Sequence, residues 1–290
     1  MSDTSHQTPP VAAPDLSVRS AGLGIRLLPH LGLFVAIIAA WEAAVALSLV
    51  NTIMVPRPSA IFEAIISLYI TKGTIYDHFF ITLGEAVGGF AIGTAVALTL
   101  AFLSSLFGPF KRYISPYAIV LNVTPGIALT PVIIAWFGYG MGSKIALAAI
   151  LCFFPIYVNA LTGLTQTDED REELFRSLGA TPRQIFAKLR MPAALPLIFA
   201  GMKIGLTTAL IGAVVAEFAQ ATAGVGVLMN RFSFQLNMAS SIATLLSMTA
   251  MGLLLFYSME FLDDRVVFWR RESRRAAKAR AKARAFKGAE

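Results

Sequence analysis

The sequence predicts an all-α, polytopic membrane protein, and three observations support this fold class. Of the 290 residues, 56% are hydrophobic and 14% are charged, whereas a soluble domain has roughly 45–50% apolar and about 25% charged residues. Six segments are apolar over about the 20 residues that a helix needs to cross a bilayer. Lipid offers no partner to open backbone groups, so these segments must fold as helices.

The six expected membrane spans have boundaries that are defined to within several residues. They lie at about residues 31–50, 79–107, 113–137, 145–166, 193–219 and 239–262. Residues 58–73 are too short and too polar to cross the bilayer. Because Ile61, Ile65 and Leu68 fall on one helical face, we expect an amphipathic helix at the membrane interface there.

Two polar tails flank the expected permease domain, which we place at residues 26–264. Residues 1–25 are polar and contain proline, and no basic segment precedes their apolar neighbour. We therefore expect a disordered cytoplasmic tail and not a signal peptide. Residues 265–290 hold 10 of the 24 Lys and Arg residues. This basic cytoplasmic tail is either disordered or helical and attracted to anionic lipid, and it accounts for the net charge of +7 without nucleic-acid binding.

The distribution of basic residues predicts the orientation in the membrane. The termini and alternate loops hold 19 Lys and Arg residues, and the opposite loops hold Arg57, Lys72, Lys144 and Arg231. Without the long tail the ratio is still 9 to 4. Short cytoplasmic loops carry the excess of Lys and Arg, so we expect both termini in the cytoplasm.

The chain lacks the usual sequence signs of a reaction centre. Cys152 is the only cysteine and lies in an apolar run, so we expect a packed thiol, and the three histidines are scattered. This pattern predicts no metal site. The sequence contains no P-loop, H-E-x-x-H or G-x-S-x-G, and the glycines at 138–142 follow a membrane helix and not a strand. We therefore expect neither a catalytic centre nor a bound cofactor in this chain.

The third expected span is interrupted by helix breakers. It contains Pro116, Pro125 and Pro131, and an interior proline bends a helix. One interpretation is a kinked packing helix. The other is that the span lines a pathway, with Asn122 and Thr124 just before the break at Pro125, because irregular backbone in a membrane is tolerated where it lines a wet cavity.

Ionisable residues within apolar runs are further pathway candidates. They include Glu85, Lys203 and Glu217. Lys203 could extend toward the cytoplasmic side, pair with Glu85, or contact solute. Glu217 is expected near the outer face, where exposure is cheap, and a gating role there is the alternative. The small-residue patterns that begin at Gly84, Gly89 and Gly201 predict close helix contacts.

A polar block interrupts the apolar chain at residues 172–196, on the expected cytoplasmic side. A helix is predicted from Asp168 to Leu178, with Thr167 or Asp168 as its N-cap. Gly179 would end it, because glycine accepts a positive φ after a helix. Thr181 and Pro182 would start a second short helix as N-cap and first residue. The apolar side of that helix needs a partner and is formed by Ile185, Phe186 and Leu189.

This block resembles a loop of a known family. The spacing Glu173-x5-Gly179-x9-Leu189-x-Met191-Pro192 resembles the E-A-A-x3-G-x9-I-x-L-P loop in membrane subunits of bacterial ABC importers. The departures are Leu174-Phe175 for Ala-Ala, and Leu189 and Met191 for Ile and Leu. The resemblance implies a coupling loop at residues 167–192 that docks into a separate ATP-hydrolysing subunit. The implied coupling residues are Glu173, Leu174, Phe175, Gly179, Ala180, Thr181, Pro182, Arg183, Ile185 and Phe186.

The resemblance extends over about residues 55–265, through PRPSAIF, the run Thr82 to Phe90, TPGIALTPVIIAWFGYGMGSKI, FFPIYVNALTGL, and VVAEF followed by GVGVLM. These motifs resemble the nitrate, sulfonate and taurine group of importer permeases, which includes permeases for pyrimidine vitamin precursors. Many sulfonate- and nitrate-type members carry Arg where this chain has Glu85, which makes it more similar to the vitamin-precursor branch.

The resemblance implies a type I importer permease in the bacterial inner membrane that carries a small polar or anionic solute. It also implies a second permease copy, two ATPase subunits that bind ATP and Mg, and a periplasmic or extracellular solute-binding protein. The residues, considered without the resemblance, leave two other functions open. An ion-coupled secondary transporter or channel would use carboxylates near the midplane, and a membrane-embedded enzyme would need a reactive constellation that the sequence lacks.

Overall fold

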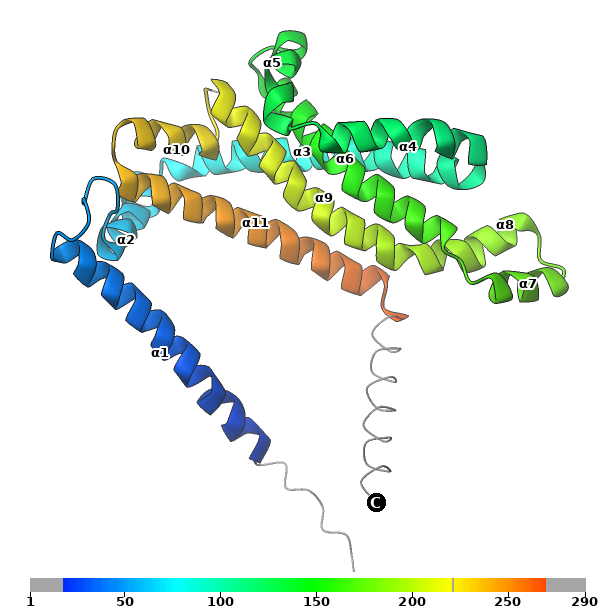
Figure 1. The fold of residues 1–290 in the computed structure, drawn as a ribbon, viewed down its shortest axis with the longest axis horizontal. Coiled ribbons are helices and arrows are strands. Elements are labelled where there is room, and N and C mark those ends of the chain that lie inside the picture. Colours follow the sequence, from blue (N-terminus) through cyan, green and yellow to red (C-terminus); the bar gives the residue numbers. More distant parts are fainter. Residues whose placement is uncertain (1–17, 221, 270–290) are drawn as a thin grey trace, which may run out of the picture. The chain divides into compact units, whose positions relative to one another are not determined.

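A computed structural model describes residues 18–220 and 222–269, and the elements in this part of the chain are helices (Figure 1). The chain divides into two units, residues 1–60 and 61–290. In the first unit, α1 (Val18–Ala46) begins within the stretch for which the sequence predicts a tail. The Glu42 carboxylate accepts hydrogen bonds from the backbone N–H and the hydroxyl of Ser59, at 3.1 and 2.9 Å. The remainder of the two predicted tails lies outside the described residues.

The second unit contains the remaining helices of the described residues. After α2 (Pro58–Ile66), whose first residues belong to the first unit, a π-helical turn covers Ser67–Thr71. The remaining elements are α3 (Ile75–Leu106), α4 (Gly108–Val123), α5 (Gly126–Phe137), α6 (Met141–Thr165), α7 (Glu169–Ser177), α8 (Pro182–Ile185), a π-helical turn at Phe186–Arg190, α9 (Met191–Gln220), α10 (Val225–Phe234) and α11 (Met238–Val266).

Five of the six predicted spans correspond to helices that are long and apolar enough to cross a membrane. Among the described residues these are Pro29–Ala46, Ile75–Leu106, Met141–Thr165, Pro182–Ala219 and Met238–Val266. The boundaries agree with the sequence prediction to within a few residues, apart from Pro182, where the short helix before α9 is included. The fold class is therefore confirmed.

The third predicted span is not a single kinked helix. It consists of α4 and α5, which meet at an angle of 103°. Thr124 adopts an extended conformation with ψ 121°, because a following proline disfavours the helical region. Pro125 has no N–H to continue the helix. The sequence predicts the position of this break but not its size, and six spans result only if the pair counts as one.

The amphipathic segment at residues 58–73 is helical through α2 and the π-helical turn. Ile61 and Leu68 are buried, Ile65 is half-buried and Glu63 is exposed. The predicted apolar face is therefore confirmed, and its location at a membrane interface stays a prediction.

Small residues bring α3, α6 and α9 into close contact at the core. A Cβ added to Gly201 would lie 2.7 Å from Cβ of Asn159, and one added to Gly212 would lie 2.7 Å from Cα of Ala148. Gly93 lies so close to Cys152 that an added Cβ would collide with Sγ. Side chains larger than hydrogen cannot fit there, as expected for helices packed through small residues. Cys152 is fully buried in this contact, as predicted.

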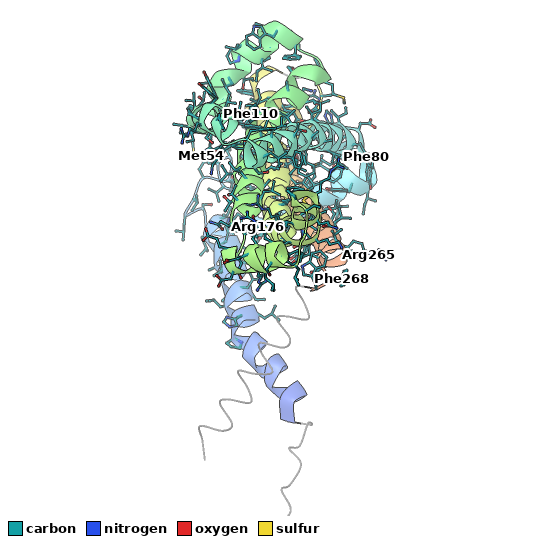
Figure 2. The ribbon with its side chains drawn as sticks, turned by 90° about the vertical axis from the view of Figure 1, so that its right-hand side faces the viewer. Met54, Phe80, Phe110, Arg176, Arg265 and Phe268 are labelled. Atoms are coloured by element: carbon teal, nitrogen blue, oxygen red, sulfur yellow. The ribbon has the colours of Figure 1, made fainter. Side chains whose placement is uncertain are left out.

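The second unit has two distinct ends. In Figure 1, α10 lies at one end, whereas α7 and α8 lie at the other. Figure 2 looks onto the α7–α8 end, with Arg176 of α7 and Arg265 of α11 labelled. The polar block and the α9–α10 turn are thus at opposite ends of the packed helices, and α6 and α9 run between them.

Candidate functional site

The polar block folds as the predicted pair of short helices. Asp168 is the N-cap residue of α7, and Gly179 follows α7 with φ +75°. The N–H groups of Gly179 and Ala180 bond to the carbonyls of Arg176 and Phe175 at 2.9 and 3.0 Å, which satisfies the helix end. The two helices and Gly179 thus form a bent element between α6 and α9.

The start of α8 is fixed by a capping box. The Thr181 hydroxyl accepts from the N–H of Gln184 at 3.4 Å, and the Gln184 amide oxygen accepts from the N–H of Thr181 at 2.8 Å. Pro182 is the first helical residue. Two otherwise unpaired donors are satisfied, so the short helix has a defined beginning.

The apolar side of α8 differs from the sequence prediction. Ile185 is buried, and the Phe186 ring packs edge-on against Phe102 with 5.3 Å between ring centroids. The expectation that this face is left for an outside partner is therefore wrong. The most exposed large apolar side chains in this block are Leu174 of α7 and Leu178, its C-cap residue, which are 56% and 76% exposed. The reason is that α8 leads directly into α9 and turns its apolar side against the membrane helices.

A carboxylate that the sequence analysis passed over anchors α7. Glu172 accepts hydrogen bonds from Arg190 at 2.8 and 2.9 Å and from Arg176 at 2.6 Å. The hydrogen bonds from Arg190, followed by the charges of both arginines, lower the pKa of Glu172 below its usual range. Glu173 is exposed beside it. A hollow of about 800 Å³, lined in part by Glu172, Glu173, Arg176 and Arg190, opens next to this anchor.

The buried charges pair differently from the prediction. Lys144 donates to Glu85 at 2.8 Å, and Lys203 donates to Asp263 at 2.7 Å. Of the three possibilities left open for Lys203, a pair with Glu85 is excluded, because Glu85 lies about 15 Å along α3 from its start whereas Lys203 lies about 26 Å from the end of α9. Those two helix ends are at the same end of the unit. Lys144 is also not a loop residue, since it lies in α6 and is 6% exposed.

Glu217 is buried and not exposed near an outer face. It is 1% exposed, lies 2.5 Å from the Thr82 hydroxyl, and accepts from the N–H of Gly226 at 2.6 Å. The expectation that Glu217 is exposed to solvent near the outer face is wrong, because the turn into α10 covers the end of α9.

The break in the third predicted span leaves polar groups at the surface of the chain. Asn122 is exposed, and the Thr124 hydroxyl donates to the carbonyl of Val120 at 2.8 Å. Among the described residues, no hydrogen bond or ion pair joins Asn122, Thr124 or Pro125 to the buried charges. The candidate pathway residues therefore form three separate groups: the break at residues 122–125, Glu85 with Glu217 at one end of the unit, and Lys203 with Asp263. The described residues also contain no cluster of His, Cys, Asp or Glu that could hold a metal ion.

The bent loop between two long, closely packed helices suggests a transport component, and a family profile decides the question. The profile described as binding-protein-dependent transport system inner membrane component matches residues 89–268. The chain belongs to this family. The match includes the α7–Gly179–α8 element, helices α6 and α9 and the broken third span, and it confirms the resemblance to ABC importer permeases.

Several relatives of this inner-membrane component have names that state a cargo, among them ThiX and SsuC. The formylaminopyrimidine transport permease ThiX of Halalkalibacterium halodurans is 31% identical over 239 residues, which are 82% of this chain and 94% of the relative. SsuC of Bacillus subtilis is named for aliphatic sulfonate transport and is 34% identical over 190 residues, 66% of this chain and 68% of the relative. Both belong to the group that the sequence predicts.

The fold is similar to a solved ABC transporter. An inward-facing structure of the MetNI methionine ABC transporter matches with a TM-score of 0.57 and 19% identity, covering 68% of this chain and 96% of the solved chain. The identity is low, so this likeness supports the importer permease fold alone.

Sequence reasoning missed several residues of this permease that the structure brings together. They are Glu172 and Arg190 in the coupling loop, Asp263 on α11, and His78, Thr82 and Lys144 near Glu85 and Glu217. The spacing of His78, Thr82 and Glu85 places them on one face of a helix and could have signalled a common role. Their partners come from other helices and left no local signal.

Proposed function

We propose that two copies of this chain form the translocation pathway of an ABC importer and couple it to two separate ATPase subunits. The ATPase subunits bind ATP and Mg, an external solute-binding protein delivers the cargo, and this chain has no ATPase site of its own. The observation that carries the proposal is the α7–Gly179–α8 element, which joins two long membrane helices and exposes two large leucines. Exposed apolar side chains on a defined helix are typical of a docking surface.

Within this loop we assign two roles. Leu174 and Leu178, with the exposed Glu173 and Arg183, contact the ATPase subunit. Ile185 and Phe186 transmit its motion, because they are packed against the membrane helices. Phe175, Ala180, Thr181 and Pro182 maintain the bend between the two helices at Gly179.

We place the coupling loop and both termini in the cytoplasm. The five basic residues of the loop support this orientation: Arg171, Arg176, Arg183, Lys188 and Arg190. From its sequence, Lys144 was counted with the opposite loops, but its side chain is buried in an ion pair. Only three Lys and Arg residues then remain in those loops, so the difference in basic residues between the two sides is larger.

We place the solute pathway at the break between α4 and α5. Asn122 is exposed in an apolar setting, and Thr124 and Pro125 form the irregular backbone. Glu85, Lys203 and Glu217 already have partners within the chain, so we assign them to holding helices together. Glu217 contributes to gating only indirectly, by holding together the helices whose side chains and backbone it bonds.

The cargo is a small polar or anionic solute. Relatives named for formylaminopyrimidine and aliphatic sulfonates support this class, and Glu85 in place of Arg favours the pyrimidine-precursor branch. Binding of nitrate, sulfonates, taurine and pyrimidine precursors to the partner binding protein would identify the cargo.

The decisive test uses the permease co-expressed with its ATPase subunit. Gly179→Pro and Glu173→Lys should abolish uptake and coupled ATP hydrolysis while the chain remains in the membrane. Arg171→Ala, at an exposed residue of the same helix, is the matched control and should retain both activities. Normal uptake by both coupling variants would overturn the proposal.

The alternative is an ion-coupled secondary transporter, which the buried carboxylates Glu85 and Glu217 keep open. It predicts uptake into ATP-free vesicles when an ion gradient is applied. The permease proposal predicts no uptake under that condition and uptake when ATP is supplied to the ATPase subunit.

A further inference from the structure

A set of side chains, four buried and one half-buried, holds the backbone of the turn between α9 and α10. Three successive N–H groups at the start of α10 each bond to a side chain of another helix or of α9. Gly224 donates to Nδ1 of His78 at 3.0 Å, and Val225 donates to the Thr82 hydroxyl at 2.8 Å. The third donor is Gly226, which bonds to Glu217. The first N–H groups of a helix have no partner within it, so these side chains complete the helix end.

The carbonyl before these donors is also bound. Lys144 of α6 donates to the carbonyl of Ala223 at 3.2 Å while it pairs with Glu85 of α3. We call the five side chains that hold residues 223–226 the outer clasp: His78, Thr82, Glu85, Lys144 and Glu217. Glu85 acts through Lys144, and the other four bond to the turn directly.

The turn fits the clasp only because it contains glycine. Gly224 has φ +127°, a conformation that other residues rarely adopt, and a Cβ there would collide with the Glu217 carboxylate. A Cβ on Gly226 would lie 2.7 Å from Oε2 of the same carboxylate. The two glycines thus allow the backbone of the turn to approach the Glu217 carboxylate closely.

The two helices that flank the coupling loop both end in the clasp. Lys144 lies near the start of α6, and Glu217 lies near the end of α9, whereas the coupling loop joins the end of α6 to the start of α9. The contacts at Gly201, Gly205 and Gly212 leave no space between these two helices. A displacement of the coupling loop is therefore transmitted by a tightly packed helix pair to Lys144 and Glu217.

We propose that the outer clasp couples the α6–α9 pair to the position of α10, with Thr82 and Glu217 as the positioning residues. Motion of the α6–α9 pair makes or breaks the bonds to residues 223–226. It thereby sets the position of the start of α10 at the end of the helices opposite the coupling loop. This inference rests on the proposed coupling function and extends it to the opposite end of the helices. Coupling between distant sites requires an element whose two states both sites bias, and the clasp supplies that element.

A labelling experiment on the permease–ATPase complex tests this inference without knowledge of the cargo. Thr222→Cys places a thiol at an exposed residue beside the turn, and the single native cysteine, Cys152, is buried. Reaction with a membrane-impermeant maleimide is measured without nucleotide and after trapping with ATP and vanadate. We expect the two rates to differ at least about fivefold, which corresponds to about 1 kcal/mol in the position of the turn.

Two substitutions at Thr82 separate positioning from folding. Thr82→Val keeps the shape and removes the bonds to Val225 and Glu217, so the nucleotide-dependent difference should disappear while ATP hydrolysis remains. Thr82→Ser keeps the hydroxyl and should retain the difference. An unchanged difference in Thr82→Val, or equal rates in the parent, overturns the inference.

A second variant keeps the test decisive if Thr82→Val does not accumulate. His78→Phe removes only the acceptor for Gly224, so the difference should shrink, and a full difference would overturn the inference. Failure of the proposed function is distinct, because then the chain would not associate with an ATPase subunit, and Gly179→Pro and Glu173→Lys would not affect ATP hydrolysis.

Discussion

The two ends of the α6–α9 pair are built in opposite ways. At the outer clasp, the charged and polar side chains are buried, apart from the half-buried His78, and are bonded to each other or to backbone, and the glycines have no free space around them. At the coupling loop, Gly179 has nothing within 4 Å of an added Cβ, and Leu174 and Leu178 are exposed. The clasp is complete within one chain, whereas the loop leaves apolar surface uncovered.

This difference indicates where a second protein is needed. A buried charge must find its partner in the same chain or it destabilises the fold. Exposed leucines on a defined helix gain from burial against another surface. Substitutions at the clasp should therefore lower the stability of the chain itself, and substitutions on the exposed face of the loop should mainly lower its association with the ATPase subunit.

The largest effect is expected when one member of the buried ion pair is removed. Lys144→Met leaves Glu85 buried without its cation and should destabilise the chain by about 3–5 kcal/mol. Thermal unfolding in detergent would measure this as a lower midpoint. Lys203→Met is the matched control and should have a smaller effect, because Lys203 is 19% exposed and Lys144 is 7% exposed at the side chain. Equal effects would contradict the contrast.

A matched pair of glycine substitutions compares the two ends directly. Gly224→Ala introduces both a collision and an unfavourable φ, so we expect a loss of about 3 kcal/mol. Gly179→Ala introduces only the unfavourable φ and should lose about 1 kcal/mol. Unfolding midpoints of the two variants, measured side by side, would show whether the clasp is the more constrained end, and the reverse order would refute it.

The coupling-loop anchor should respond to acid. Because its folded-state pKa is lowered, Glu172 stabilises the chain fully above its unfolded pKa of about 4.3, and this contribution is lost as the pH falls through the folded pKa. Glu172→Gln should lower stability by about 1 kcal/mol between pH 5 and 7. The difference from the parent should shrink as the pH falls below the unfolded pKa and vanish below the folded-state pKa. A pH-independent difference would mean that the arginine bonds do not contribute.

The smallest effect on the chain itself is expected at the exposed leucines. Leu174→Ser with Leu178→Ser should change the free energy of unfolding by less than about 0.5 kcal/mol, while the ATPase subunit no longer co-purifies. Phe186→Ala is the control on the inner face and should lower the unfolding midpoint, because its ring packs against Phe102. Co-purification that survives the double substitution would place the docking surface elsewhere.

The membrane helices and the bent loop could be predicted because their signals are local. Apolar length defined five spans, and Gly179 followed by Thr181 and Pro182 defined the two short helices. The sequence left a Glu85–Lys203 pair open, and could not exclude it, because pairing depends on how far each residue lies along its own helix. Lys144 was assigned to a loop because glycine precedes it at positions 140 and 142, although the helix already begins at Met141.

Which side of the coupling loop is exposed could also not be predicted from local sequence patterns. Apolar spacing identified Ile185, Phe186 and Leu189 as one face but could not show that the membrane helices cover it. Pro125 marked the break in the third span, and only the three-dimensional structure gave its angle of 103°. Long-range register and the coverage of a face by distant elements are the physical quantities that the sequence did not reveal.

The length of α9 has a consequence for rotation as well as for distance. Glu217 lies 26 residues after Met191, the first residue of the helix. Each residue advances the helix by about 1.5 Å and turns it by about 100°. Insertion of one alanine between these residues would barely change the fit to the bilayer, yet it would rotate the Glu217 carboxylate about 100° away from Thr82 and Gly226. The number of residues in α9 is therefore set by angular phase between its two ends, and membrane thickness alone would not fix it.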